Sequence, residues 1–362
     1  MFEALLNRPV NMMLQKLRDS QQTDGAQLEG EPSMVKSFGQ DQEAVIAASS
    51  GVAICDRTHW GLLELKGADR LSFLHNQSTN DLKALKVGQG CDTVILTSTA
   101  RTIDLVSAYV TEDSILLLVS PSRREQLLQW FDRYIFFGDK VECCDLTHTL
   151  ATFSLLGPES QALLEKWGLA LPTELHQHQT VTVEDITLRI AVGSGLSTPG
   201  YTLLVSYEQA AELWQMCRQA GAVPMGTQAW EQLRVQQGRP SPDAELTEDY
   251  NPLEAGLWHA ISLDKGCYIG QETIARLNTY NGVKQQLWGI QLEESAEPGA
   301  SLLLEDRKVG ILTSQVQTAD GYLGLGYIKT KAGGAGLKVQ IGEATGTVVA
   351  VPCLTRAIPT SE

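Results

Sequence analysis

Two pairs of segments determine the predicted fold. LKGADRLSFL (residues 65–74) and LLGPESQALL (residues 155–164) each read as a strand that ends at a glycine and is followed by the start of a helix. The second pair repeats the order of strand, turn and helix and consists of ILLLVSPSRREQLLQW (residues 115–130) and TLLVSYEQAAELWQM (residues 202–216). Its two members lie nearly as far apart in the sequence as the two members of the first pair. A pattern that recurs at a fixed offset indicates repeated structural units. The sequence therefore predicts two related halves, each with an α+β fold.

The sequence pattern changes after Lys284, where few helical periods remain. Short β-type runs separated by Gly, Pro and Asp turns are typical of a small antiparallel barrel or sandwich. We expect an α+β protein with an N-terminal extension over 1–40 and a duplicated body over 41–283, in halves of about 45–145 and 146–283. A C-terminal antiparallel β-barrel is expected over 284–362.

Composition excludes several classes of function. The 362 residues include 28 Lys and Arg against 43 Asp and Glu, which gives a formal charge of -15. Such a charge repels phosphate backbones, so direct nucleic-acid binding is not expected. The longest apolar runs, such as Ile115 to Val119, are far shorter than the roughly 20 residues that span a bilayer. No membrane attachment is expected.

The cysteines and the N-terminal residues indicate a compartment. Seven cysteines is an odd number without disulfide-type spacing, which indicates a reducing environment. The first residues contain no uninterrupted apolar core of a signal peptide, and Asp24, Glu29 and Glu31 make the next stretch too acidic for a transit peptide. We therefore expect the protein to be cytoplasmic. The histidines show no ligand spacing, so no metal site is expected.

The segment DKGCYIGQETIARL (residues 264–277) carries the strongest chemical signal. Cys267 precedes a helix-like run that begins near Gly270, and it follows Lys265. A helix N-terminus and an ammonium both favour a thiolate, so one interpretation is a reactive cysteine. The alternative is a small apolar residue buried in a tight turn, which is the commonest environment of a free cysteine.

This segment resembles a known signature. It is similar to the K-G-C-[FY]-x-G-Q-E motif of YgfZ-type folate-binding proteins, which are relatives of the glycine-cleavage T-protein, an aminomethyltransferase. The matching positions are Lys265, Gly266, Cys267, Tyr268, Gly270, Gln271 and Glu272. GADRLSFLHNQSTNDLKAL (residues 67–85) and NPLEAGLWHAISLDKGCYIGQE (residues 251–272) extend the resemblance, which covers most of residues 45–355. It implies a body of two related subdomains that binds tetrahydrofolate.

The resemblance also implies site residues. Asp81 matches an aspartate that T-proteins place beside the folate and its reacting amine, so Asp81 and Cys267 are the candidate catalytic residues. The alternative for Asp81 is a helix cap within an ordinary Asn-Asp turn. Tyr201 corresponds to a tyrosine against the pterin, Arg234 to an arginine for the anionic end of folate, and Glu245 to a glutamate for the pterin edge. Their alternatives are a strand tyrosine, a surface arginine and a solvated acid.

One departure from the T-protein pattern bears on activity. Gly200 and Tyr201 run straight into Thr202, where T-proteins have a Thr-Gly-Glu loop. The resemblance therefore favours a monomeric accessory protein for the assembly or repair of iron–sulfur clusters, which supports tRNA modification indirectly through cluster enzymes. Its expected partners are reduced folate and cluster proteins or assembly factors. Two alternatives remain: a folate-dependent aminomethyltransferase, and a binding module without folate in which Cys267 is structural. Whether the chain is an enzyme stays open.

Overall fold

The computed structural model describes residues 2–30, 33–280 and 282–357, and in the first helix it describes side chains from Met12 onward. It divides into two compact units, between which the chain passes repeatedly. The first unit comprises Met1–Gly67, Lys86–Gly90 and Ala108–Trp230, and the second comprises Ala68–Leu85, Cys91–Ser107 and Glu231–Glu362.

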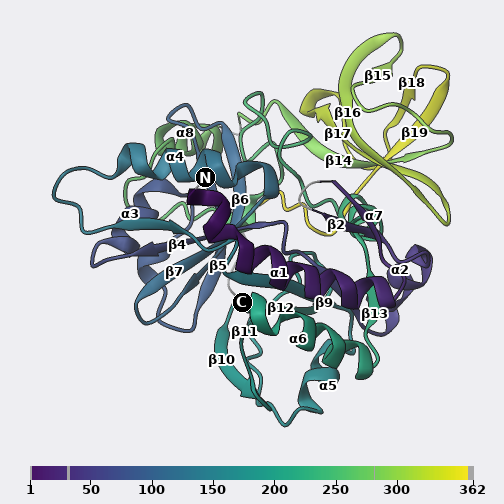
Figure 1. Ribbon diagram of the computed structural model, residues 1–362. Coiled ribbons are helices and arrows are strands. Elements are labelled where there is room, and N and C mark those ends of the chain that lie inside the picture. The colour runs from purple at the N-terminus through teal and green to yellow at the C-terminus, as the bar shows by residue number, and fades with distance from the viewer. Residues whose placement is uncertain (1, 31–32, 281, 358–362) are drawn as a thin grey trace. The chain divides into compact units, whose positions relative to one another are not determined.

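The first unit combines helices with sheets (Figure 1). Its helices are α1 (Phe2–Thr23), α2 (Asp41–Ser50), α4 (Arg124–Tyr134), α5 (Ser160–Glu165) and α6 (Tyr207–Gln219), with a short 3-10 turn at Pro121–Arg123. Its strands are β1 (Gln27–Glu29), β2 (Met34–Ser37), β3 (Ala53–Asp56), β4 (Gly61–Lys66), β7 (Ser114–Val119), β8 (Glu142–Asp145), β9 (Leu150–Leu156), β10 (His178–Val183), β11 (Ile186–Val192), β12 (Gly200–Ser206) and β13 (Val223–Met225).

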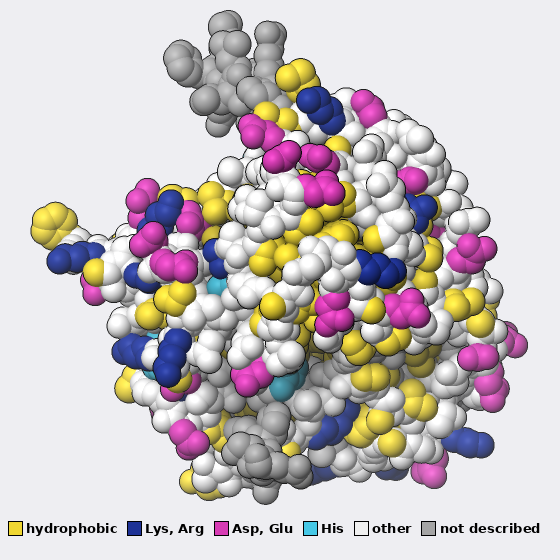
Figure 2. All heavy atoms as spheres, turned by 90° about the horizontal axis from the view of Figure 1, so that it is seen from below, with side chains coloured by type: hydrophobic (Ala, Val, Ile, Leu, Met, Phe, Trp, Pro, Cys, Tyr) yellow, Lys and Arg dark blue, Asp and Glu magenta, His cyan; other side chains and the backbone are white. Residues whose placement is uncertain are grey.

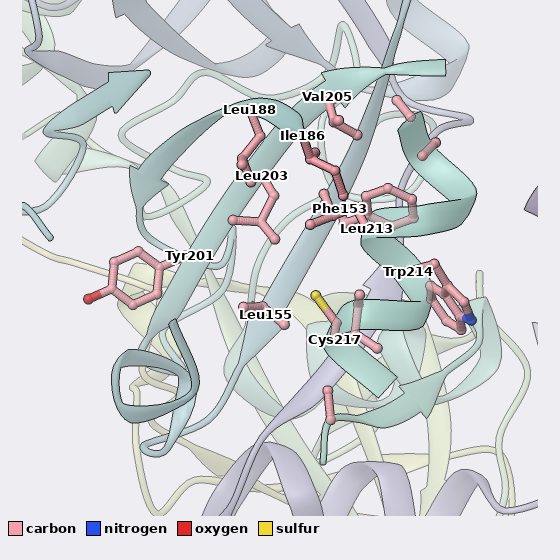
Figure 3. Close-up of a cluster of buried hydrophobic side chains, with 14 of the residues drawn as sticks. Phe153, Leu155, Ile186, Leu188, Tyr201, Leu203, Val205, Leu213, Trp214 and Cys217 are labelled. Atoms are coloured by element: carbon pink, nitrogen blue, oxygen red, sulfur yellow. The ribbon is translucent and has the colours of Figure 1, made fainter. Parts of the chain in front are cut away.

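A six-stranded sheet forms the centre of the first unit, in the order β10-β11-β12-β9-β3-β13. Its neighbouring strands are antiparallel except that β13 runs parallel to β3. Strands β7, β4 and β8 lie side by side as a second group of antiparallel strands. Apolar side chains of the six-stranded sheet, among them Phe153, pack against α6, whose Leu213 and fully buried Trp214 belong to the same cluster (Figure 3). Burial of this face holds the sheet and the helix together.

The predicted repeat is visible in the local structure. Strands β4 and β9 are each followed directly by a glycine with positive φ, 101° at Gly67 and 121° at Gly157, and a helix starts three residues after the glycine. A Cβ atom at Gly67 would lie 2.0 Å from the carbonyl oxygen of Lys140, and one at Gly157 would lie 2.3 Å from that of Gly51. Only glycine fits either position. The predicted fold class, with its two related α+β halves, is confirmed.

Helix α1 is part of the first unit. Leu17 is fully buried on its inner face, and the helix packs along α6. Next to it, the buried guanidinium of Arg18 binds the carboxylate of Asp56, which also accepts a hydrogen bond of 2.8 Å from Gln21 Nε2. Burial alone would raise the pKa of Asp56, but Arg18, Gln21 and Thr58 together hold that pKa below its ordinary value.

We expect acid to weaken this attachment. Because the folded-state pKa of Asp56 is lowered, its contribution to stability is complete above the unfolded value of 3.8 and is lost as the pH falls through the folded value. Urea unfolding from about pH 6 to about pH 2.5 should show a smaller loss of unfolding free energy in Asp56→Asn than in wild type. The exposed Asp113→Asn is the control. Equal slopes for wild type and Asp56→Asn would contradict the assignment.

The second unit contains short helices and a closed β-barrel (Figure 1). Its helices are α3 (Arg70–Gln77), η1 (Leu82–Ala84), α7 (Thr227–Gln237, which begins in the first unit), η3 (Trp258–Ala260), α8 (Gln271–Thr279) and η4 (Thr330–Ala332). Its strands are β5 (Gly90–Leu96), β6 (Thr102–Val110, which ends in the first unit), β14 (Gln285–Leu292), β15 (Ser301–Leu304), β16 (Arg307–Thr318), β17 (Gly321–Lys329), β18 (Lys338–Ile341) and β19 (Ala344–Val349).

The barrel closes in the order β14-β17-β16-β15-β18-β19, and every neighbouring pair is antiparallel. Its interior is filled by aliphatic side chains such as Ile290, Leu302 and Leu312. The C-terminal antiparallel barrel predicted from the sequence is thereby confirmed. A separate core holds Tyr268 and Ile274 against Val94 and Leu96 of β5, so the K-G-C segment is anchored by apolar packing.

The surface agrees with the composition. On the face shown in Figure 2, acidic and basic side chains are interspersed, and yellow apolar groups lie between them. In the part of the chain that the structure describes, no helix has the length and apolar character needed to cross a membrane.

Candidate functional site

The K-G-C segment of the second unit forms a loop that leads into α8. Its two glycines differ in whether a residue with a Cβ atom could replace them. Gly270 has φ 81°, and a Cβ atom there would lie 2.9 Å from the carbonyl oxygen of Thr97, so glycine is required. At Gly266 a Cβ atom would lie 3.8 Å from His75 Nε2, which is ordinary contact. The turn of the loop thus requires glycine at position 270, whereas Gly266 lies beside His75 and has room for a Cβ atom.

Cys267 is exposed, and it is the only one of the seven cysteines that is. The alternative of a buried apolar residue is therefore wrong for this position. Cys55 and Cys217 show that environment instead, because burial raises the pKa of both thiols. An exposed thiol four residues before a helix N-terminus is accessible to a ligand, an oxidant or a partner protein.

Lys265 is directed away from solvent into a cradle of three carbonyl groups. Its Nζ donates hydrogen bonds of 2.6 Å to His75 O, 2.7 Å to Ser78 O and 2.7 Å to Asn80 O. These carbonyls lie at the C-terminal end of α3 and in the turn that follows, where a positive charge is favoured. The same Nζ lies 4.8 Å from the centre of the Tyr268 ring. One lysine therefore joins the K-G-C loop to the turn that carries Asp81.

The electrostatics of Lys265 follow from this position. Burial lowers its pKa to about 7, and the nearby Asp81 and Cys91 oppose that shift. Each of the three carbonyls accepts one N–H, which requires the ammonium form. The ammonium is therefore committed to the cradle, so the expectation that Lys265 stabilises a Cys267 thiolate directly is replaced by a positioning contact. Burial also raises the pKa of Cys91 to about 12.

Asp81 lies in the turn that Lys265 grips. Its Oδ1 accepts hydrogen bonds from the backbone N–H groups of Lys83 (3.2 Å) and Ala84 (3.3 Å), so the cap alternative is confirmed for helix η1. Nδ1 of the buried His75 lies 3.2 Å from the same Oδ1. Burial and Lys265 lower the pKa of His75, which keeps the imidazole neutral at pH 7. Among the described residues these contacts all use Oδ1, so Oδ2 of this partly exposed carboxylate is available to a ligand.

Arg234 and Glu245 form a buried pair 3.0 Å apart, with the Glu245 carboxylate fully buried. The guanidinium also donates to Glu231, to Ser314 Oγ and to a backbone carbonyl. The carboxylate accepts from Thr313 and Ser314 of β16. Burial alone would lower the pKa of Arg234, but the two glutamates hold it above its ordinary value.

The surface-arginine and solvated-acid alternatives are therefore wrong for this pair. A folate carboxylate at Arg234 would have to displace one of these bonds, because all five N–H donors are directed to protein groups. The ligand roles of both residues stay predictions.

Tyr201 belongs to the first unit, in β12. It is 5% exposed, and in Figure 3 its hydroxyl points away from Trp214 and Cys217 at the edge of the buried cluster. Burial raises the pKa of its hydroxyl. Gly200–Ser206 is an uninterrupted strand, which agrees with the absence of the T-protein loop after Tyr201.

Two residues beside Asp81 and Lys265 were not predicted as part of the site. One is His75, which lies six positions before Asp81 in the same motif. Cys91 carried no signal in the sequence, because its approach to Lys265 depends on the entry of β5 into the second unit. Spacing along one turn could have indicated His75, whereas Cys91 required the fold.

Comparison with known proteins defines the class. Residues 23–265 match the GCVT N-terminal domain, and the chain belongs to this family. It is 44% identical over 336 residues to the Arabidopsis thaliana protein named "Putative transferase At1g60990, chloroplastic", covering 91% of this chain and 78% of that protein. It is 28% identical to an aminomethyltransferase of Bacillus mycoides, covering 86% and 87% of the two chains.

The fold is shared with a solved structure. Aminomethyltransferase T of the glycine cleavage system from Bartonella henselae matches with a TM-score of 0.82 at 18% identity, covering 95% of this chain and 99% of that one. The predicted relationship to the T-protein superfamily is confirmed.

Proposed function

We propose that this member of the GCVT family is a tetrahydrofolate-binding accessory protein of the YgfZ type, which serves the assembly or repair of iron–sulfur clusters. In this proposal it supports tRNA modification only indirectly, through cluster enzymes. The observation that carries the proposal is the exposed Cys267 on a loop that Lys265 joins to the Asp81 turn. An exposed thiol on a loop that is tethered to the turn of a folate-type carboxylate suits a protein that couples a reduced cofactor to a cluster or its oxidation products.

The residues of the Asp81 turn fit a reduced pterin. A pterin ring presents N–H donors along one edge, and Asp81 offers a partly exposed carboxylate oxygen to accept from them. Nδ1 of the neutral His75 lies 3.2 Å from Oδ1 of the same carboxylate and leaves its charge in place. Bound tetrahydrofolate would supply reducing power or a one-carbon acceptor.

The direct test is anaerobic calorimetric titration of the purified chain with tetrahydrofolate. Asp81→Asn keeps an oxygen for the Lys83 and Ala84 N–H groups but removes the charge, so we expect it to fold normally and to bind about tenfold or more weakly, since a charged hydrogen bond contributes roughly 1.5–3 kcal/mol. Cys267→Ala should bind as wild type does. Absence of saturable binding by the wild-type chain would overturn the folate proposal.

A second candidate function is aminomethyl transfer. The relatives named aminomethyltransferase, at 28% identity over most of both chains, favour it. The uninterrupted strand after Tyr201 argues against it, because the loop glutamate of T-proteins has no counterpart there. A reconstituted glycine-cleavage assay in which this chain replaces the T-protein separates the two functions. Turnover that depends on Asp81 would favour the transferase.

A further inference from the structure

The surroundings of Lys265 are unusual for a charged side chain. A charged side chain is rarely buried without a partner of opposite charge, yet Lys265 is 6% exposed and its three hydrogen bonds all go to backbone carbonyls. The charged and titratable groups around it are Asp81, Lys83, Cys91 and His75. Such an arrangement resembles a cation site in which the cation is tethered to the chain.

Within the described part of the chain, backbone hydrogen bonds hold the loop on either side of Lys265. Before it, Ser262 N–H donates to Thr79 O at 3.0 Å, and after it, Ile269 N–H donates to Asn76 O at 2.9 Å. Between these two bonds lies the stretch with Cys267. The lysine is thus the polar link in the middle of that stretch, whereas the two backbone bonds and the buried Tyr268 secure its ends.

Asn80, one of the three residues whose carbonyls form the cradle, also contacts Asp81. Asn80, whose carbonyl accepts the third bond from Lys265, is fixed by Nδ2 to Asp92 O at 2.8 Å, and its Oδ1 accepts the N–H of Asp81 at 2.9 Å. The orientation of Asp81 is therefore set by a turn in which the carbonyls of Ser78 and Asn80 both accept from one ammonium. Displacing that ammonium frees the carbonyls to rotate toward water, and the carboxylate moves with them.

We propose that Lys265 is a positioning residue that fixes the Cys267 loop and the Asp81 turn relative to each other by filling a three-carbonyl cation cradle. The proposal rests on the proposed function for the meaning of the Asp81 site, but the cradle itself does not depend on folate. It assigns to the first residue of the K-G-C signature a role distinct from that of the thiol.

The test compares Lys265→Met with Lys331→Met. Methionine keeps most of the length of Lys265 and removes the charge, whereas Lys331 is an exposed lysine of η4 in the barrel segment. We expect Lys265→Met to retain its secondary structure and to bind tetrahydrofolate about tenfold more weakly, and we expect iodoacetamide to alkylate its Cys267 several-fold faster. Lys331→Met should match wild type. Wild-type affinity together with a wild-type alkylation rate in Lys265→Met would overturn the proposal.

Chemical rescue keeps the proposal testable if methionine disturbs the loop by its bulk. Lys265→Ala leaves the cradle open, so ethylammonium at millimolar concentrations should enter it and slow Cys267 alkylation back toward the wild-type rate. The same salt should not change the rate in Lys265→Met, whose side chain fills the space. Absence of rescue in a folded Lys265→Ala protein would contradict the cradle.

The two proposals fail separately. A wild-type chain that does not bind tetrahydrofolate refutes the proposed function, while the alkylation and rescue measurements still decide the role of Lys265.

Discussion

Cys267→Ala protein should accumulate and melt as wild type does, and should nevertheless fail to restore cluster-dependent enzyme activity to cells that lack the wild-type gene. The thiol is exposed, so its removal changes the unfolding free energy by no more than about 0.5 kcal/mol. Its chemistry, in contrast, has no substitute among the cysteines, since the others are buried or only partly exposed. The measurement is the activity of a cluster-containing tRNA-modifying enzyme in such cells.

The control for this experiment is Cys144→Ala, which removes a partly exposed thiol from β8 of the first unit. It should restore full activity. If Cys267→Ala also restored full activity, the thiol would have no role in the proposed function, and only folate binding would remain of that proposal.

Arg234→Met should be the most destabilising of the substitutions considered. Removing one partner of a buried pair leaves the other charge uncompensated, at a cost of roughly 3–5 kcal/mol. Here the remaining group is Glu245, fully buried beneath β16, so the loss should unfold the second unit at clearly lower urea concentration. Urea denaturation followed by circular dichroism measures the change.

Two further variants make this prediction specific. Glu231→Gln removes the half-exposed partner of Arg234 and should cost less than about 1 kcal/mol. The double variant Arg234→Met with Glu245→Gln should cost less than the sum of its two single changes, because neither charge is then left alone. Additive effects would show that the pair does not act as a unit.

Much of the fold could be predicted because its signals are local. The strands that end at Gly67 and Gly157 carry their turn geometry in three or four adjacent residues, and the short β-runs after Lys284 carry their own turns. The division into two units could not be predicted. It depends on β5 and β6, whose residues join segments far from them in sequence.

The candidate site was predictable only in part, for a related reason. Cys267 can be recognised from its adjacent residues, because it lies in an eight-residue signature. The direction of a long side chain cannot be, because the carbonyls that receive Lys265 lie almost two hundred residues earlier. Likewise Arg234 and Glu245 were recognised as polar site residues, but their mutual pairing beneath the barrel depends on Ser314.

The packing of helix α1 against α6 has a consequence for biosynthesis. A ribosome adds about 5–20 residues per second, and roughly 200 residues separate the two helices, so α1 precedes its partner by on the order of ten to forty seconds. During that interval Leu17 lacks the apolar face against which it is later buried. Arg18 likewise lacks part of the protein surroundings that later bury its ion pair with Asp56. The contact between α1 and α6 therefore forms only after α6 has left the ribosome, and until then the face of α1 that carries Leu17 lacks its cover.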